Sequence, residues 1–116
     1  MSIFRRLFAS RPSGPPEDPQ DLARRLGVPA PDRRRKLVLY KFDSCPYCRR
    51  VLRTLDELAV EVDLRDTLQD RHHGTALFEL TGRTQVPCLV IDGTPLFESS
   101  DIVDWLRSYA AHARAA

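Results

Sequence analysis

From residue 37 onwards, the pattern of hydrophobic and polar positions predicts a strand, a helix and a second strand. Leu37–Phe42 is a short run rich in β-forming residues and is closed by Asp43-Ser44. Val60–Leu64 alternates at period two, which predicts the second strand. Between the two, a helix should begin at Pro46, because apolar residues recur there at steps of three and four: Cys48, Val51, Leu52, Leu55 and Leu58.

The pattern that follows predicts a second helix and a hairpin. The helix should cover roughly Gln69–Leu80, with Gly82 as its C-terminal stop. Two short apolar runs, Cys88–Ile91 and Thr94–Phe97, flank Asp92-Gly93. This pair is typical of a type I′ turn, in which both central residues need positive φ.

A last helix should begin near Ser99 or Ser100, with an apolar side formed by Ile102, Val103, Leu106 and Tyr109. A helical crossover makes the first two strands parallel, and a two-residue turn makes the last two antiparallel. The pattern therefore predicts an α/β domain with a four-stranded mixed sheet covered by three helices.

Length and charge distribution divide the chain into an extension and a domain. At 116 residues and 42% hydrophobic, the chain fits one core. Residues 1–36 hold six of the nine prolines and nine Lys/Arg against four Asp/Glu, whereas residues 37–116 hold nine against twelve. We therefore predict a basic, proline-rich extension over 1–36 and a slightly acidic domain over 37–116. Nucleic acid is not expected as a main partner, because phosphate binding needs a basic face on the folded part.

The extension carries two local signals. Asp18, Pro19 and Gly27 have the cap, first-turn proline and stop of one short helix that includes Leu22 and Leu26. The first residues are either a mobile basic leader or a weak membrane-surface anchor or targeting peptide. The second interpretation rests on an apolar helical face beside arginines: Ile3, Phe4, Leu7 and Phe8 with Arg5, Arg6 and Arg11.

Three cysteines are too few, and odd in number, for a secreted disulfide scaffold. The apolar stretch near Met1 is too short for a signal-peptide core, and no run of about 18 apolar residues predicts a transmembrane helix. We therefore expect a reducing, cytoplasmic setting, in which a C-x-x-C pair is more often redox-active or metal-binding than structural.

The chemistry of the chain centres on Cys45-Pro46-Tyr47-Cys48, placed where a strand leads into a helix. The free N–H groups and the positive dipole end of that helix favour an anion, so the Cys45 thiol should ionise more readily than a free cysteine. Cys48, one turn later on the buried face, is placed to attack a mixed disulfide formed at Cys45. We predict Cys45 as the nucleophile and Cys48 as the resolving thiol.

Two alternatives are a structural pair of buried cysteines and half of a zinc site. Zinc needs four ligands, and the further candidates do not form a second closely spaced pair: Cys88, His72, His73 and His112. No metal is expected as a cofactor.

Three segments together resemble the glutaredoxin family over about residues 37–112. They are Cys45-Pro46-Tyr47-Cys48, Val86-Pro87 before the third strand, and Glu98-Ser99-Ser100-Asp101-Ile102 at the start of the last helix. The resemblance implies a thioredoxin-like fold, a cis peptide before Pro87 and a groove for glutathione as co-substrate.

In such a groove, the Val86 backbone would pair with the cysteinyl main chain of glutathione. Ser99 and Ser100 would bind the γ-glutamyl carboxylate, and Glu98 its amine. Tyr47 would line the groove beside the sulfur.

The sequence also departs from the glutaredoxin pattern. Many members carry a lysine three residues before the first active cysteine, where this chain has Phe42; Lys41 should then lie on the opposite face of the strand. Gln85 stands where a threonine is common, and Gln85 or Arg83 would have to anchor the glycine carboxylate of glutathione. For Cys88 we favour the interpretation of a small buried strand residue over that of a third redox thiol.

The sequence around Val86-Pro87 and Glu98-Ser99 also resembles that of the N-terminal domain of glutathione transferases, a family that adds a helical second domain. The main hypothesis is a glutathione-dependent thiol–disulfide oxidoreductase acting on disulfide-containing or glutathionylated proteins. Its alternatives are a glutathione-binding, redox-sensing module without turnover, and an iron–sulfur or zinc carrier that uses Cys45 with bound glutathione.

Overall fold

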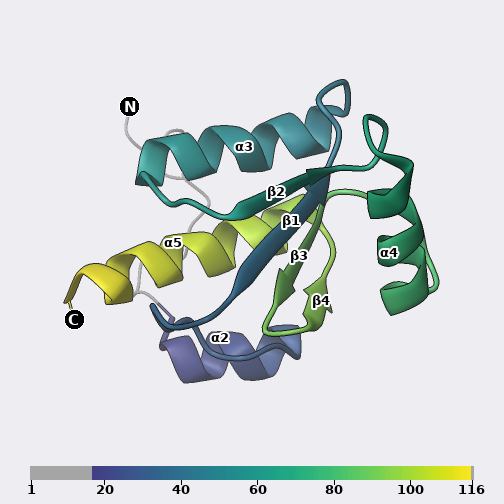
Figure 1. The fold of residues 1–116 in the computed structure, drawn as a ribbon. Helices are drawn as coiled ribbons and strands as arrows, with labels where there is room; N and C mark the ends of the chain where they lie inside the picture. The colour runs from purple at the N-terminus through teal and green to yellow at the C-terminus, as the bar shows by residue number, and fades with distance from the viewer. Residues whose placement is uncertain (1–16, 116) are drawn as a thin grey trace, which may run out of the picture.

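The computed structural model describes residues 17–115 and has a four-stranded mixed sheet in the order β2-β1-β3-β4 (Figure 1). β1 pairs in parallel with β2 and antiparallel with β3, and β3 pairs antiparallel with β4. The bounds are Leu37–Lys41 for β1, Asp63–Asp66 for β2, Cys88–Ile91 for β3 and Thr94–Leu96 for β4. The predicted sheet and its strand directions are confirmed.

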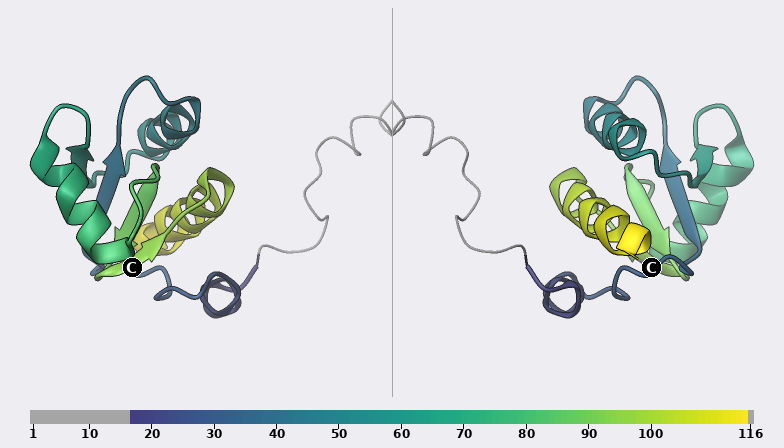
Figure 2. Two further views of the ribbon diagram at one scale, coloured as in Figure 1. Left: turned by 90° about the vertical axis from the view of Figure 1, so that its right-hand side faces the viewer. Right: turned by 90° about the vertical axis from the view of Figure 1, so that its left-hand side faces the viewer.

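Helices cover both faces of the sheet (Figure 2). Helices α3 (Pro46–Leu58) and α5 (Ser99–Ala115) pack on one face, and α4 (Arg71–Thr81) packs on the other. The alternation along β1 separates the two cores: Leu39 packs with the α3 and α5 side chains, and Tyr40 packs with Leu77 of α4. Cys48 of α3 and Cys45, which directly precedes the helix, are therefore carried on the face away from α4.

The second strand and second helix differ from their predicted bounds. Pairing with β1 begins at Asp63, opposite Val38, so β2 is Asp63–Asp66 and not Val60–Leu64. Val60 and Val62 produce the period-two signal because they pack, partly buried, against the core before the strand begins. Helix α4 starts at Arg71 because the Asp70 carboxylate accepts the backbone N–H of His72 at 2.9 Å, which caps the helix there. Gly82 ends it with φ 76°, as predicted.

The hairpin turn is anchored to the start of β1. Asp92 and Gly93 have φ of 48° and 88°, which confirms the type I′ prediction. The Asp92 carboxylate accepts the Lys36 backbone N–H at 2.7 Å and the Arg35 guanidinium at 3.0 Å. These contacts fix the end of the sheet opposite Cys45 and Cys48.

Part of the extension packs on the domain. Helix α2 (Pro19–Leu26) begins at Asp18 and stops at Gly27, as predicted. Leu22 and Val28 join the core beneath α5, and the Trp105 indole donates to the Pro29 carbonyl at 2.9 Å. The amphipathic pattern proposed for residues 3–8 lies outside the described residues. Within residues 17–115, no helix has the length and apolar character needed to cross a membrane.

Candidate active site

Cys45 occupies the N-cap of α3, between the end of β1 and the first helical residue, Pro46. Its backbone N–H donates to the Phe42 carbonyl at 3.3 Å, and its carbonyl accepts from the Arg49 N–H at 3.0 Å. Its side chain makes no capping hydrogen bond and is partly exposed. The sulfur therefore lies at the electropositive start of the helix and can be reached from solvent.

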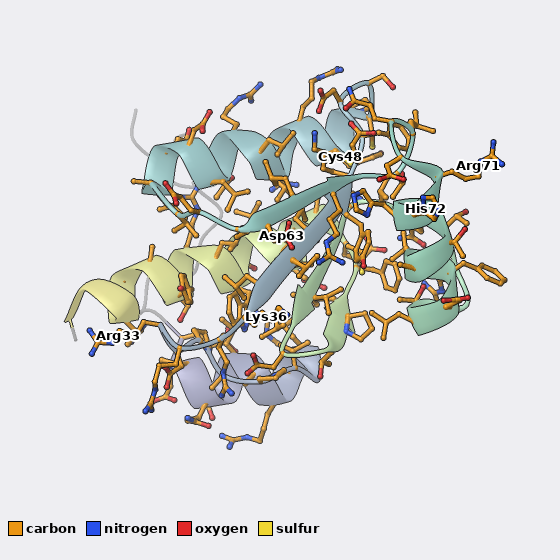
Figure 3. The ribbon with its side chains drawn as sticks, viewed as in Figure 1. Arg33, Lys36, Cys48, Asp63, Arg71 and His72 are labelled. Carbon is orange, nitrogen blue, oxygen red and sulfur yellow. The ribbon has the colours of Figure 1, made fainter. Side chains whose placement is uncertain are left out.

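Cys48 lies one turn further along α3 and is fully buried (Figure 3). The pKa of its thiol is raised to about 12, mainly by burial; a side-chain hydrogen bond to Cys45 acts in the same direction, and a backbone hydrogen bond from Phe42 acts against both. The bond to Cys45 favours the protonated form, so the Cys48 thiol is the donor. Both cysteines are free thiols. The structure thus places the pair side by side, with one sulfur accessible and the other protonated and enclosed.

Lys41 is a feature that the sequence analysis placed wrongly. It was predicted on the opposite face of β1, but it lies two residues after Leu39 and so on the face that α3 covers. Its ammonium contacts Asp43 at 2.8 Å and Asp66 at 3.5 Å, and its charge lowers the pKa of Cys48. The prediction assumed that Phe42 belongs to the strand and assigned Lys41 to the face opposite Phe42. In the structure β1 ends at Lys41, so the alternation of faces does not extend to Phe42.

The Val86-Pro87 peptide is cis, as the resemblance implied. Pro87 is buried and precedes β3, whose first residue, Cys88, pairs with Tyr40 near the end of β1. The register brings the cis bend beside the segment that leads from β1 to Cys45.

Glu98, Ser99 and Ser100 reach the same end of the sheet through the β3–β4 hairpin, in which Leu89 pairs with Leu96. Glu98 is exposed and has φ 70°, an uncommon conformation for a residue with a side chain. Its carbonyl accepts from Ile102 at 3.0 Å as the first bond of α5. The N–H groups of the three residues between them precede the helical bonding pattern, and such groups suit an anion.

The remaining predicted groove residues lie on the surface. The Tyr47 side chain is 65% exposed, and Gln85 is exposed. The Arg83 guanidinium lies 4.9 Å from the Phe97 ring centroid and 3.5 Å from the Gln85 amide oxygen. Arg83 and Gln85 therefore act as one polar unit next to the cis bend.

Cys88 lies on the other face of the sheet from Cys48. It is fully buried with Val38, Tyr40 and Leu77, and burial raises the pKa of its thiol to about 11. This placement agrees with the structural interpretation of Cys88. Among residues 17–115, no group of three or more His, Cys, Asp or Glu is arranged to hold a metal ion.

Because of the two buried thiols, the stability of the fold should decrease with rising pH in the alkaline range. The pKa values of Cys48 and Cys88 are raised in the folded state, so their contribution is complete below the unfolded value near 9 and is lost as pH rises towards 11 and 12. Between pH 9 and 10 we expect the free energy of unfolding to fall by about 1 kcal/mol for each thiol. Urea unfolding under reducing conditions measures it.

The control for this prediction is the Cys48→Ala/Cys88→Ala double variant, which keeps every other titrating group. Its stability should be lower at pH 7 but should fall less steeply above pH 9. Equal slopes for parent and variant would show that neither thiol is held in its neutral form by the fold.

Comparison with known proteins identifies the family. The family model described as the glutathione S-transferase N-terminal domain matches residues 39–114. The chain belongs to this family. A curated relative, Glutaredoxin-C4 of Arabidopsis thaliana, is 38% identical over 72 residues, which are 60% of this chain and 53% of the relative. The chain thus spans about half the length of the curated relative that it matches.

Solved structures place the fold in the same group. A glutathione transferase homologue from Drosophila mojavensis, solved with bound glutathione, is 25% identical with a TM-score of 0.55, over 64% of this chain and 35% of that one. Oxidized glutaredoxin 2 from Chlamydomonas reinhardtii is 22% identical with a TM-score of 0.52, over 66% of this chain and 78% of that one. The glutathione S-transferase N-terminal domain of this chain has the expected thioredoxin-like α/β fold.

Proposed function

We propose that this chain is a glutathione-dependent thiol–disulfide oxidoreductase. The observation that carries the proposal is the Cys45–Cys48 pair, with an accessible sulfur at a helix N-cap hydrogen-bonded to a buried, protonated thiol. The likeness to a glutaredoxin over 72 residues supports it. The family match supports glutathione as the co-substrate.

The proposed reaction on a glutathionylated protein has two steps. The Cys45 thiolate attacks the glutathione sulfur, which forms a Cys45–glutathione disulfide and releases the protein thiolate to take up a proton. A second glutathione thiolate then attacks the sulfur of the bound glutathione. This step yields oxidised glutathione and returns Cys45 to its thiolate form.

On a disulfide within a protein, Cys45 forms a mixed disulfide with one protein sulfur. Cys48 then loses its proton, attacks the Cys45 sulfur and releases the fully reduced protein, which leaves a Cys45–Cys48 disulfide. Two glutathione molecules reduce that disulfide and leave as oxidised glutathione. Lys41 assists the Cys48 step, because its positive charge favours the Cys48 thiolate.

The glutathione would lie along the cis bend and the start of α5. The Val86 backbone would pair with its cysteinyl main chain, and Ser99 and Ser100 would bind the γ-glutamyl carboxylate. Glu98, which is exposed, would accept from the γ-glutamyl amine. Tyr47 would cover the sulfur, and the Arg83–Gln85 unit would hold the glycine carboxylate.

A coupled assay tests the proposal: hydroxyethyl disulfide, glutathione, glutathione reductase and NADPH, with and without the full 116-residue chain. We expect NADPH oxidation to rise in proportion to protein concentration above the protein-free rate. Calorimetric titration with reduced glutathione runs alongside it. Binding without turnover would replace the proposal with a glutathione-binding, redox-sensing module, and neither binding nor turnover would overturn both.

A further inference from the structure

Three exposed arginines lie in the turns of α3 that follow the proposed nucleophile. We call Arg49, Arg50 and Arg53 the arginine face. The Arg49 guanidinium donates to the Asp43 carbonyl at 3.2 Å, so it lies beside the loop that leads to Cys45. Residues three and four apart are neighbours on a helix surface, which joins Arg53 to the other two. The arginine face therefore extends from the active-site loop along the outer side of α3.

The charges of the arginine face are not neutralised within the part of the molecule that the structure describes. Among residues 17–115, no carboxylate forms an ion pair with any of the three guanidinium groups. Two nearby carboxylates have other partners: Asp43 contacts the Lys41 ammonium at 2.8 Å, and Glu57 lies 3.6 Å from Arg107. The positive charges beside Cys45 therefore remain available to a binding partner.

This distribution of charge works against the stability of α3. The start of a helix carries a partial positive charge, yet its first two turns hold arginines and no acidic residue. The acidic residues, Asp56 and Glu57, lie in the last turn, where the helix dipole disfavours them as well. Arg49 and Arg50 also repel Arg53 across one turn. Neither helix stability nor internal ion pairing explains the arginines, which points to a partner outside the chain.

We infer that the arginine face docks an acidic polypeptide segment of the substrate protein, next to the cysteine whose disulfide Cys45 attacks. The inference rests on the proposed function, since it assigns the protein substrate of the same site. Glutathione would lie along the cis bend and the start of α5, which leaves the outer side of α3 for the protein part of a mixed disulfide. Asp and Glu carboxylates are the groups of a polypeptide that pair with guanidinium groups.

A polypeptide is favoured over lipid or nucleic acid because the arginine face adjoins Cys45. A protein disulfide must approach that sulfur to react, and the residues around it then lie against α3. Exposed charges of this kind act mainly on the rate of association and on its salt dependence. The expected signature is therefore a faster, salt-sensitive reaction of Cys45 with acidic substrates.

Thiol exchange with charged peptides tests the inference on the full 116-residue chain. Peptides of equal length carry one cysteine, joined to thionitrobenzoate in a disulfide and flanked on both sides by glutamates, glutamines or lysines. Attack by the Cys45 thiolate forms a Cys45–peptide disulfide and releases the coloured thionitrobenzoate thiolate. At about 0.05 M salt, the second-order rate constant should be roughly tenfold higher for the glutamate peptide than for the glutamine peptide, at about twofold for each arginine. At about 0.5 M salt the two rates should converge, and the lysine peptide should be slowest at low salt.

Two double variants locate the effect. Arg50→Gln/Arg53→Gln should reduce the preference for the glutamate peptide to about twofold, while the rate with the glutamine peptide stays within about twofold of the parent. Arg33→Gln/Arg34→Gln is the matched control, because it removes the same charge near the start of β1, where Figure 3 shows Arg33 far from Cys48. It should keep the preference within about twofold of the parent.

Four results would overturn the inference. Equal rates for the glutamate and glutamine peptides at low salt would show that acidic segments are not preferred. An equal slowing of both peptides in Arg50→Gln/Arg53→Gln would mean that the arginines act on Cys45 itself. Equal losses of preference in both double variants would indicate attraction by net charge without a docking surface. Tight binding of duplex DNA or phosphatidylserine vesicles at about 0.1 M salt, abolished by Arg50→Gln/Arg53→Gln, would assign the arginine face to another partner.

The exchange assay and the test of the proposed function can fail separately. Thionitrobenzoate release needs neither glutathione nor turnover, whereas the coupled assay with hydroxyethyl disulfide needs both and contains no charged peptide. Turnover of hydroxyethyl disulfide without a preference among the peptides would contradict only the docking of an acidic segment. A preference that depends on the arginine face without glutathione turnover would contradict only the catalytic proposal.

Discussion

Serine in place of Cys45 should bring glutathione-dependent disulfide reduction down to the protein-free rate, a loss of roughly a thousandfold or more. A serine hydroxyl stays protonated at neutral pH and does not attack a disulfide, whereas a thiolate does. Cys45 occupies the N-cap of α3 without a capping hydrogen bond, and serine is favoured at that position. The variant should therefore fold at least as stably as the parent. Initial rates of NADPH oxidation measure the loss.

Cys88→Ala is the control for this variant, because it removes a thiol from the opposite face of the sheet. It should keep turnover close to that of the parent, at a cost of about 1 kcal/mol in stability for the lost core volume. Residual activity of Cys45→Ser within tenfold of the parent, or a larger loss in Cys88→Ala, would show that the chemistry does not run through Cys45.

The order of elements and the sheet directions could be predicted because each rests on a local signal. Asp92-Gly93 specifies its turn through positive φ at both residues, and Pro46 with the apolar stripe after it specifies α3. Strand β2 is an edge strand whose first two residues, Asp63 and Leu64, are both exposed. The residues of β2 therefore show no alternation of apolar and polar positions. The prediction followed Val60 and Val62 instead, which precede the strand and pack against the core.

Contacts between residues that lie far apart in the sequence could not be predicted from local signals. The docking of α2 depends on the Trp105 indole meeting the Pro29 carbonyl, and neither residue signals the other in the sequence. Likewise, a backbone hydrogen bond from Phe42 to Cys48 and the charge of Lys41 both act on the resolving thiol. These contacts follow from where β1 ends, which pattern alone located one residue too late.

Loss of Cys48 should separate the two proposed reactions. In Cys48→Ser, turnover of glutathione mixed disulfides should stay within about fivefold of the parent, because glutathione itself releases Cys45 in that reaction. Reduction of a disulfide within a protein should fall by roughly a hundredfold. The buried thiol that touches Cys45 reacts at an effective concentration that free glutathione does not reach. Insulin reduction, compared with the hydroxyethyl disulfide assay, measures the separation.

The pH dependence of protein disulfide reduction gives this prediction a second readout. Cys48 must lose a proton from a thiol whose pKa is raised to about 12, so the step that it performs should accelerate as pH rises from 7 to 9. Cys48→Ala should behave like Cys48→Ser with both substrates, which distinguishes loss of the sulfur from any hydrogen bond that a serine hydroxyl makes to Phe42. Equal losses on both substrates would mean that Cys48 supports the site structurally and does not resolve mixed disulfides.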